Sequence, residues 1–327
     1  MNALTTGHVE SEYVFSDDVS RGVVGALSGR QGIDQSRADM IESASPHATA
    51  VKCSLDERIK LWETGRQNIF DDPQFFQAYL RFRETDEGFN AELEEPAMLG
   101  LVPDVAGKRV IDLGCGTGRL CRRLAKAGAA EVLGVDCSAR MIELAESENG
   151  EFRKTVKYRR CFMEDFDAPT AGSDLVVSSM ALHYVQELGP LFGKVSKWIV
   201  PGGVFVFSVE HPIFTAGPRK WLSSTEHGNL WPVSRYAQQG SRVVSWLGHE
   251  VLKFHRSFAR ITNMLLTSDF ALLAVDEPCS KQGNAPLPTV SQLENERPAF
   301  LLMKSVAHTN RTGLRPLHCM KQFPDSA

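Results

Sequence analysis

The stretch VIDLGCGTGRL, residues 110–120, carries glycines at positions 114, 116 and 118 between an apolar run and a segment with helical spacing. Such a turn between a strand and a helix lets backbone N–H groups approach a nucleotide closely. A dinucleotide fingerprint has the spacing G-x-G-x-x-G, whereas this turn has G-x-G-x-G and Arg119 at the place of the third glycine. Asp112 stands just before the turn, and its carboxylate would repel a pyrophosphate but attract an ammonium group. The turn therefore favours a ligand with a cationic end and no pyrophosphate.

Two further acidic positions extend the predicted ligand. Asp136 ends the second predicted strand, in GVDCS, where a carboxylate can accept hydrogen bonds from both ribose hydroxyls. In MEDF, after the third predicted strand, Asp165 could accept from an adenine amino group while Phe166 or Met163 packs on the ring. An ammonium group, a ribose and an adenine together describe S-adenosylmethionine. A nicotinamide cofactor stays an alternative only if Arg119 is tolerated in place of the third glycine.

Strands and helices alternate in the order that would place these acids at one edge of a sheet. Apolar runs predict seven strands at 108–114, 131–136, 156–161, 173–180, 204–210, 270–277 and 299–306. Helical spacing is found at about 59–82, 96–102, 119–127, 139–147, 190–200 and 256–266. Near-continuous apolar strands separated by helices are typical of parallel sheets covered on both faces. The sequence therefore predicts an α/β, Rossmann-like fold with a mostly parallel seven-stranded sheet and helices on both faces.

Composition limits the classes of partner. The chain has 327 residues, a net charge of −4 and seven cysteines without a CxxC pair. No long basic run is present, which disfavours nucleic acid, and the scattered cysteines fit a reducing compartment without a disulfide framework or zinc site. The N-terminus lacks the features of a secretory signal, and no apolar stretch approaches the ~20 residues of a membrane span. We therefore expect a cytoplasmic protein with no membrane partner; the oligomeric state is not predicted.

Four motifs in order, VIDLGCGTG, GVDCS, EDF and VPGGVFVFS, resemble those of the class I S-adenosylmethionine-dependent methyltransferases, over about residues 65–306. More narrowly, QNIFDDPQFFQAYLRFR, ALHYV and FSVEHPIFTA resemble a small-molecule subgroup of bacterial and fungal type. The departure YLRFRETDEGF leaves Arg81 and Arg83 as alternatives for the cofactor carboxylate. The cofactor-binding residues that the motifs and the resemblance imply are Tyr79, Arg83, Asp112, Gly114, Cys115, Gly116, Thr117, Gly118, Asp136, Cys137, Met141, Glu164, Asp165, Phe166 and Met180.

The same resemblance implies a domain organisation. Residues 51–308 are predicted to form a methyltransferase domain, in which a cofactor half (about 65–212) precedes a lid insertion after the fifth strand (about 213–255) and a final helix and strands (256–306). Residues 1–50 are expected to be a flexible leader and 309–327 a loose tail. The insertion contains Trp221, Trp231, Tyr236 and Trp246, which could form an apolar pocket for the methyl acceptor or a local core of the lid.

Methyl transfer from a sulfonium is an in-line displacement, so alignment and exclusion of water matter most, and a base is needed only for a protonated acceptor. Three candidate catalytic residues follow the fourth and fifth strands, where ligands bind in such sheets: His183 in MALHYV, and Glu210 and His211 in SVEHP. A histidine can take a proton near neutral pH. In the alternative interpretation His183 packs against the next helix, and Glu210 and His211 form a hydrogen-bonded turn before Pro212.

These observations predict methyl transfer from S-adenosylmethionine to O, N or S of a small-molecule acceptor, with a place in specialised metabolism. The sequence SSMALHYV stands where methylases of base amino groups carry an Asn/Asp-Pro-Pro-Tyr-like motif, which disfavours nucleic-acid substrates. No metal is expected, because Glu164, Asp165 and Asp167 are better explained at the adenine edge. A protein methyltransferase and a non-catalytic S-adenosylmethionine-binding protein are the alternatives.

Overall fold

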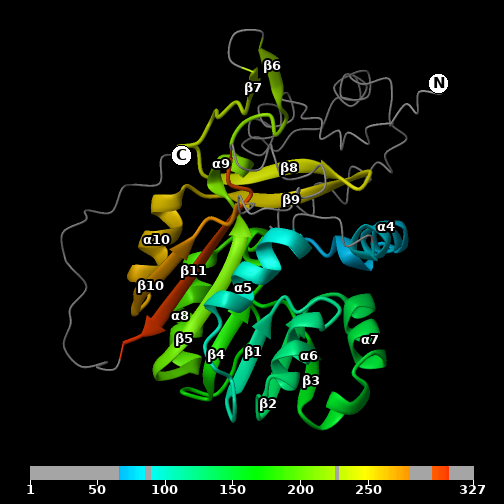
Figure 1. The fold of residues 1–327 in the computed structure, drawn as a ribbon, viewed down its shortest axis with the longest axis vertical. Coiled ribbons are helices and arrows are strands. Elements are labelled where there is room, and N and C mark those ends of the chain that lie inside the picture. Colours follow the sequence, from blue (N-terminus) through cyan, green and yellow to red (C-terminus); the bar gives the residue numbers. More distant parts are fainter. Residues whose placement is uncertain (1–65, 85–89, 225–227, 280–296, 309–327) are drawn as a thin grey trace, which may run out of the picture.

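The computed structural model describes residues 66–84, 90–224, 228–279 and 297–308, and its centre is a seven-stranded sheet (Figure 1). The strand order is β10-β11-β5-β4-β1-β2-β3. The strands are β1 (Arg109–Leu113), β2 (Glu131–Asp136), β3 (Val156–Arg160), β4 (Ser173–Ser178), β5 (Ile199–Glu210), β10 (Phe270–Asp276) and β11 (Phe300–Ala307). All seven predicted strands are thus confirmed.

The sheet is parallel except at β11, which pairs antiparallel with both β5 and β10. The parallel strands β1, β2, β4 and β5 therefore end at the same edge of the sheet. Asp136 closes β2 and Glu210 closes β5 at that edge. Ligands bind at the carboxyl ends of strands in such open sheets, so this edge is where a site is expected.

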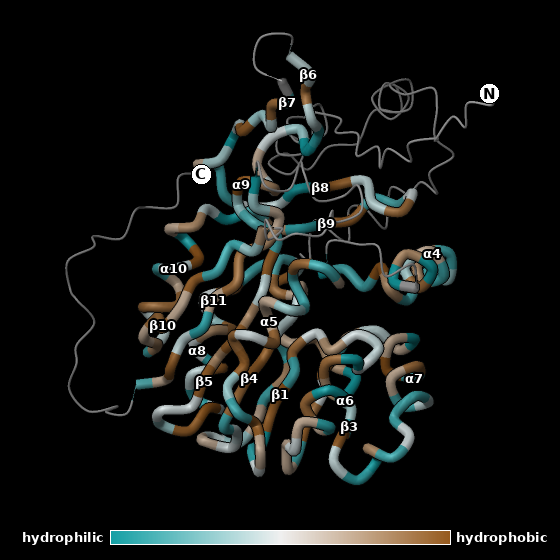
Figure 2. The backbone as a smooth tube through the Cα atoms, viewed as in Figure 1, coloured by the Kyte–Doolittle hydropathy of each residue, from teal (hydrophilic) through white to brown (hydrophobic). Residues whose placement is uncertain are grey.

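Helices cover both faces and bury two separate cores. Along β1, Val110 packs into the core shared with α5, α6 and α7, while Ile111 and Leu113 pack into the core shared with α8 and α10, because successive side chains of a strand point to opposite faces. Hydrophobic residues accordingly concentrate along the central strands (Figure 2). The helices are α5 (Glu95–Leu101), α6 (Arg119–Lys126), α7 (Ala139–Ser147), α8 (Leu188–Trp198) and α10 (Phe258–Leu266).

Two additions lie over the carboxyl ends of the strands (Figure 1). Before the sheet, the short helix η1 (Ile69–Asp71) leads into α4 (Pro73–Glu84), and η2 (Asn90–Glu94) leads into α5. After β5, the insertion forms α9 (Pro212–Thr215) and two hairpins, β6 (Leu222–Ser224) with β7 (Gly228–Leu230) and β8 (Gly240–Trp246) with β9 (His249–His255). The short helices η3 (Gly150–Lys154) and η4 (Leu182–Tyr184) complete the described elements.

The structure therefore has the predicted Rossmann-like architecture, and the segment expected as a lid has its own hairpins. The predicted leader 1–50 and tail 309–327 lie outside the described residues. Within the parts that are described, no helix is long and apolar enough to cross a membrane.

Candidate functional site

A cavity of about 520 Å³ lies at the carboxyl edge of the sheet, between the glycine turn and the β8–β9 hairpin. This volume is in the range of small-molecule sites. Most of the predicted site residues line it: Tyr79, Arg83, Asp112, Gly114, Cys115, Gly116, Thr117, Asp136, Cys137, Met141, Glu164, Met180, His183 and Glu210. Four others do not: Gly118, Asp165, Phe166 and His211.

The glycine turn brings backbone to the cavity at Gly114. Its φ is +75°, and a Cβ added there would lie 2.2 Å from the Cβ of Ala181. Gly116 also has a positive φ, +52°, and its N–H donates to Asp136 Oδ2 at 2.9 Å. Gly118, predicted to bind the cofactor, does not line the cavity. A glycine is still needed there, because an added Cβ would lie 2.2 Å from the Tyr158 hydroxyl. The first two glycines shape the cavity, and the third lets α6 begin against β3.

Asp112 lies under the turn and is almost completely buried. Burial raises the pKa of its carboxyl to about 7, although a hydrogen bond from Cys121 acts in the opposite direction. That hydrogen bond runs from Cys121 Sγ to Asp112 Oδ2 over 3.2 Å. A cationic group entering the cavity would favour the ionised form of this acid.

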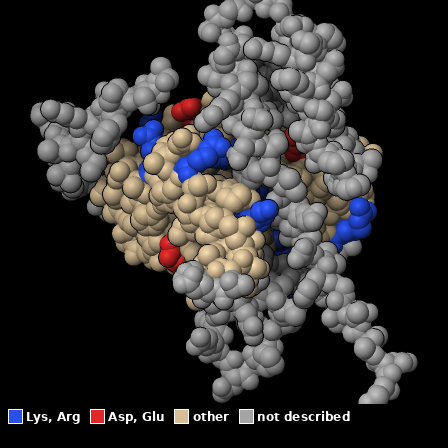
Figure 3. Space-filling view, turned by 90° about the horizontal axis from the view of Figure 1, so that it is seen from above, with Lys and Arg blue, Asp and Glu red and all other residues tan. Residues whose placement is uncertain are grey.

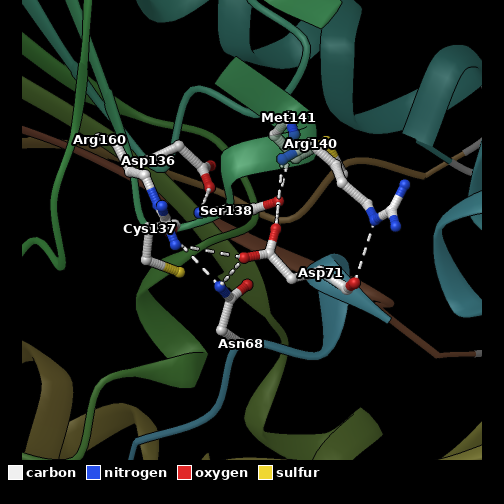
Figure 4. A network of polar contacts seen from close by, with 8 residues as sticks. All are labelled: Asn68, Asp71, Asp136, Cys137, Ser138, Arg140, Met141 and Arg160. Atoms are coloured by element: carbon white, nitrogen blue, oxygen red, sulfur yellow. Dashed lines mark hydrogen bonds and ion pairs between the residues drawn. The ribbon is translucent and has the colours of Figure 1, made fainter. Parts of the chain in front are cut away.

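Asp136 is held at the end of β2 by the start of the next helix (Figure 4). Its Oδ1 accepts from the Ser138 N–H at 2.9 Å, and Ser138 caps α7 by accepting from the Met141 N–H at 3.1 Å. Two backbone donors, those of Gly116 and Ser138, therefore fix the orientation of the Asp136 carboxylate at the cavity wall. Each carboxylate oxygen keeps a further lone pair for a ligand hydroxyl.

The segment before α4 is tied to the same corner (Figure 4). Asp71 Oδ1 accepts from Ser138 Oγ at 2.6 Å, and Asn68 Nδ2 donates to Asp71 Oδ2 at 2.7 Å and to the Cys137 carbonyl at 3.3 Å. Arg140 Nε donates to the Asp71 carbonyl at 3.0 Å. This network positions α4 above the cavity. It joins residues about seventy positions apart, so no local sequence motif reveals it.

From α4, Tyr79 and Arg83 reach the cavity lining, whereas Arg81 is exposed and does not. Burial raises the pKa of Tyr79, although the nearby Arg83 lowers it. The placement favours Arg83 over Arg81 as the cofactor-facing arginine.

The segment after β3 departs from the prediction. Both the Asp165 and the Phe166 N–H donate to the Phe162 carbonyl at 3.0 Å, and this turn directs Phe166 into the core, 5.1 Å from the Trp198 ring. Asp165 points outward and binds the guanidinium of Arg66 at 2.6 and 2.7 Å. That ion pair lowers the Asp165 pKa.

The preceding residues, Phe162, Met163 and Glu164, line the cavity instead. Of the residues predicted beside the adenine, Met163 and Glu164 therefore lie at the cavity, whereas Asp165 and Phe166 do not. Burial raises the pKa of the Glu164 carboxyl.

A buried ionic cluster forms the opposite end of the cavity, next to the β8–β9 hairpin. Glu210 Oε1 accepts from Lys253 Nζ at 2.6 Å and from Arg219 Nη2 at 2.9 Å. Burial alone would raise the pKa of Glu210, but Arg219 and Lys253 outweigh it and hold the carboxyl well below its usual range. Glu210 is therefore a poor proton acceptor at neutral pH. Lys253 and Arg219 were not predicted as site residues.

His183 lines the same end and is buried. Burial lowers its pKa to about 3, although Glu210 acts in the opposite direction, so the ring is neutral at physiological pH and a weak base. Its Nδ1 is buried and has no hydrogen-bond partner among the described residues, and the same holds for Glu210 Oε2.

The structure does not place His211 where a catalytic base was expected. Its Nδ1 accepts from the Ile213 N–H at 3.0 Å and caps α9, and its Nε2 lies 2.7 Å from Glu277 Oε1. Both ring nitrogens are thus engaged away from the cavity, which is the hydrogen-bonded turn that the sequence left as an alternative.

The tryptophans of the insertion were predicted to form either a pocket for the acceptor or a local core, and they divide between the cavity wall and such a core. Trp246 lines the cavity. Trp231 stacks on Phe214 with ring centroids 5.6 Å apart, and Trp221 meets Trp231 edge-on at 5.2 Å. The second group forms a local core of the insertion.

Two further observations concern nucleic acids and metal ions as ligands. Seen from above, the Lys and Arg side chains of the described residues lie in separate groups on that face (Figure 3). Among the described residues, no group of three or more His, Cys, Asp or Glu could hold a metal ion.

Comparison with known proteins adds independent evidence. Residues 110–203 match the model of a methyltransferase domain. A solved structure of an S-adenosylmethionine dependent methyltransferase from Mesorhizobium loti is 36% identical, with a TM-score of 0.63 over 68% of this chain and 99% of that one. An uncharacterized protein of Haemophilus influenzae is 30% identical over 64% of this chain and 86% of its own. A ubiquinone biosynthesis O-methyltransferase of Bradyrhizobium is 33% identical over 32% of this chain and 40% of its own length.

Proposed function

The chain belongs to the class I S-adenosylmethionine-dependent methyltransferases, and from this premise we propose that it methylates a small molecule bound at the Glu210–Lys253 end of the cavity. One observation carries the proposal: a single cavity joins the glycine turn to the buried cluster of Glu210 and Lys253. Donor and acceptor can therefore meet inside it.

The residues of the cofactor end suit the parts of S-adenosylmethionine. The positive φ of Gly114 and its close approach to Ala181 would leave bare backbone against the methionine portion. Asp112 would hold the ammonium group and Asp136 the ribose hydroxyls, while Phe162, Met163 and Glu164 would surround the adenine; all five line the cavity. When bound, the cofactor supplies an activated methyl group.

The acceptor end favours a compact ligand. Its walls come from η4, the end of β5, α9 and the β8–β9 hairpin, and the insertion lies over the strand ends. A cavity of about 520 Å³ shared with the cofactor leaves room for a small acceptor rather than a folded protein surface. The named O-methyltransferase relative, which takes part in ubiquinone biosynthesis, is consistent with such an acceptor.

Proximity and alignment of donor and acceptor would supply most of the rate. His183 and Glu210, predicted as bases, hold their protons too weakly for that role at neutral pH, so we assign them to positioning the acceptor. His211 has no part in the proposed reaction.

Calorimetric titration with S-adenosylhomocysteine tests the cofactor site. We expect binding by the full chain and a loss of about a hundredfold in affinity, or about 2.7 kcal/mol, for Asp136→Ala, because the ribose partner is removed. Asp165→Ala is the matched control and should change affinity less than about twofold, since an exposed ion pair contributes little. No heat with the wild-type chain would refute the proposal.

Incubation with S-adenosylmethionine labelled in the methyl group, together with cell extract fractionated by size, tests the acceptor class. We expect label in the small-molecule fraction. Label in protein alone would favour the alternative of a protein methyltransferase.

A further inference from the structure

Lys253 is a buried cation at the acceptor end of the cavity, with 6% of its surface exposed. Its Nζ donates to Glu210 Oε1 at 2.6 Å, and an ammonium group has three donors. No other hydrogen bond of this ammonium is found within the described part of the chain. Glu210 Oε1 also accepts from Arg219, so the carboxylate is shared between two cations and Lys253 keeps donors for a ligand.

Aromatic rings enclose this ammonium. Nζ lies 4.9 Å from the ring centre of Trp246 and 5.6 Å from that of Tyr184. Phe70 meets Tyr184 edge-on at 6.0 Å, and Tyr79 meets Trp246 edge-on at 6.1 Å. These rings come from segments far apart in the chain and all line the cavity, so they form an apolar wall suited to a flat ring.

We propose that Lys253 binds the reacting oxygen of a phenol-type acceptor as its oxyanion, with the ring of the acceptor against Trp246 and Tyr184. The inference rests on the proposed function and names the acceptor class for it. The hydroxyl proton passes to water as the acceptor binds. An oxygen lone pair then forms the bond to the methyl carbon, the carbon–sulfur bond breaks, and its electron pair stays on sulfur, giving S-adenosylhomocysteine and a methyl ether.

The charged groups around Lys253 are consistent with this role. Burial lowers its pKa to about 8, with Arg219 acting in the same direction and Glu210 opposing, so the side chain is protonated at neutral pH. The neighbouring His183 is neutral there, and Arg256 donates to the Gln186 carbonyl at 2.6 Å. Coulomb attraction in a buried site is stronger than in water, which favours ionisation of a hydroxyl placed beside the ammonium.

The test uses 4-nitrophenol, whose ionised form absorbs visible light, with the full-length chain saturated with S-adenosylhomocysteine. We expect the bound probe to ionise at a pH lower by about one unit or more than in buffer, a tenfold shift. 4-Nitroanisole has the same ring and no ionisable hydroxyl, and should bind more weakly.

Lys253→Met should abolish the shift, whereas Lys253→Arg should retain it. The matched control is Lys157→Met, on β3, where the ammonium donates to the Arg153 carbonyl at the surface; it should behave as the wild type. Binding of S-adenosylhomocysteine by every variant establishes that it is folded.

The outcomes separate the two proposals. If S-adenosylhomocysteine binds but 4-nitrophenol either does not bind or ionises as in buffer, the inference is overturned and the proposed function stands. Retention of the shift in Lys253→Met also overturns it. If S-adenosylhomocysteine itself does not bind, the proposed function fails and the inference with it.

Discussion

The two ends of the cavity are built from different kinds of contact. At the cofactor end, the backbone of a short turn and the acid that closes the next strand, Asp136, are joined by a hydrogen bond from Gly116. At the acceptor end, Glu210 meets Lys253, 43 residues later in the chain, through buried charged side chains. A local backbone motif can be recognised in a sequence, whereas a cluster of side chains assembled by the fold leaves no spacing to recognise. The difference also predicts that substitutions at the cofactor end act on binding and those at the acceptor end act on stability.

The largest effect is expected at Glu210. Glu210→Gln leaves the buried Lys253 and Arg219 without their carboxylate, and breaking a buried ion pair in this way costs about 3–5 kcal/mol in the free energy of unfolding. Urea denaturation at pH 7 measures the loss.

Glu148→Gln is the control, because Glu148 pairs with Arg122 at 2.6 Å but is half-exposed, and such pairs contribute less than about 1 kcal/mol. Equal losses in the two variants would contradict the assignment of Glu210 to a buried cluster.

Because the folded pKa of Glu210 is lowered, the contribution of its ionised carboxylate to the free energy of unfolding is fully present above the unfolded pKa of 4.5. That contribution is lost as the pH falls from 4.5 toward the folded pKa.

The second effect concerns binding. Gly114→Ala places a Cβ within 2.2 Å of Ala181 Cβ at a φ of +75°, so the turn must move away from the cofactor. We expect an affinity for S-adenosylhomocysteine lower by about a hundredfold, near 2.7 kcal/mol, by calorimetric titration.

Gly107→Ala is the control for backbone strain, because Gly107 also has a positive φ, +70°, but no atom lies within 4 Å of a Cβ added there. It should lose about 1–2 kcal/mol of stability from backbone strain and no affinity. Similar affinity in both variants would show that the turn does not contact the cofactor.

The third effect is a pH dependence of cofactor affinity. Asp112 has a pKa of about 7 in the free protein and is protonated below that pH, while the ammonium group of the ligand prefers the carboxylate. Binding should release a proton, so the affinity for S-adenosylhomocysteine should rise by up to about tenfold per pH unit between pH 5 and 7 and then level. Asp112→Asn should give a flat profile, and a flat profile of the wild-type chain would mean that Asp112 does not hold the ammonium.

Most of the fold could be predicted from the sequence, because most strands are apolar runs and some helices, such as α7 and α10, begin at a capping serine. Ser138, for example, stands directly before the predicted helix 139–147 and accepts from the Met141 N–H. The position of Asp136 at the cavity could be predicted, because it is the last residue of a parallel strand. Phe166 was misplaced because a single turn of chain, closed by hydrogen bonds to the Phe162 carbonyl, decides which of two adjacent side chains faces the cavity.

No local sequence pattern identifies Lys253 as a site residue. In the sequence it is one lysine in a strand-like run, and its role depends on Glu210 and on rings contributed by η4 and β8. The network of Asn68, Asp71 and Ser138 has the same property, since its members share no spacing that a motif could record. Tertiary contacts between distant polar residues define the parts of the site that the sequence left open.

The smallest effect is expected at His211, directly after β5. His211 caps α9 through its Nδ1, so His211→Ala should lower the free energy of unfolding by about 0.5–2 kcal/mol and leave both the affinity for S-adenosylhomocysteine and methyl transfer to cell extract unchanged. His211→Asn should recover part of the stability, because an asparagine oxygen can accept the same N–H. Loss of methyl transfer in His211→Ala without loss of stability would instead support the catalytic role that the sequence suggested. The acceptor would then bind next to His211 and α9.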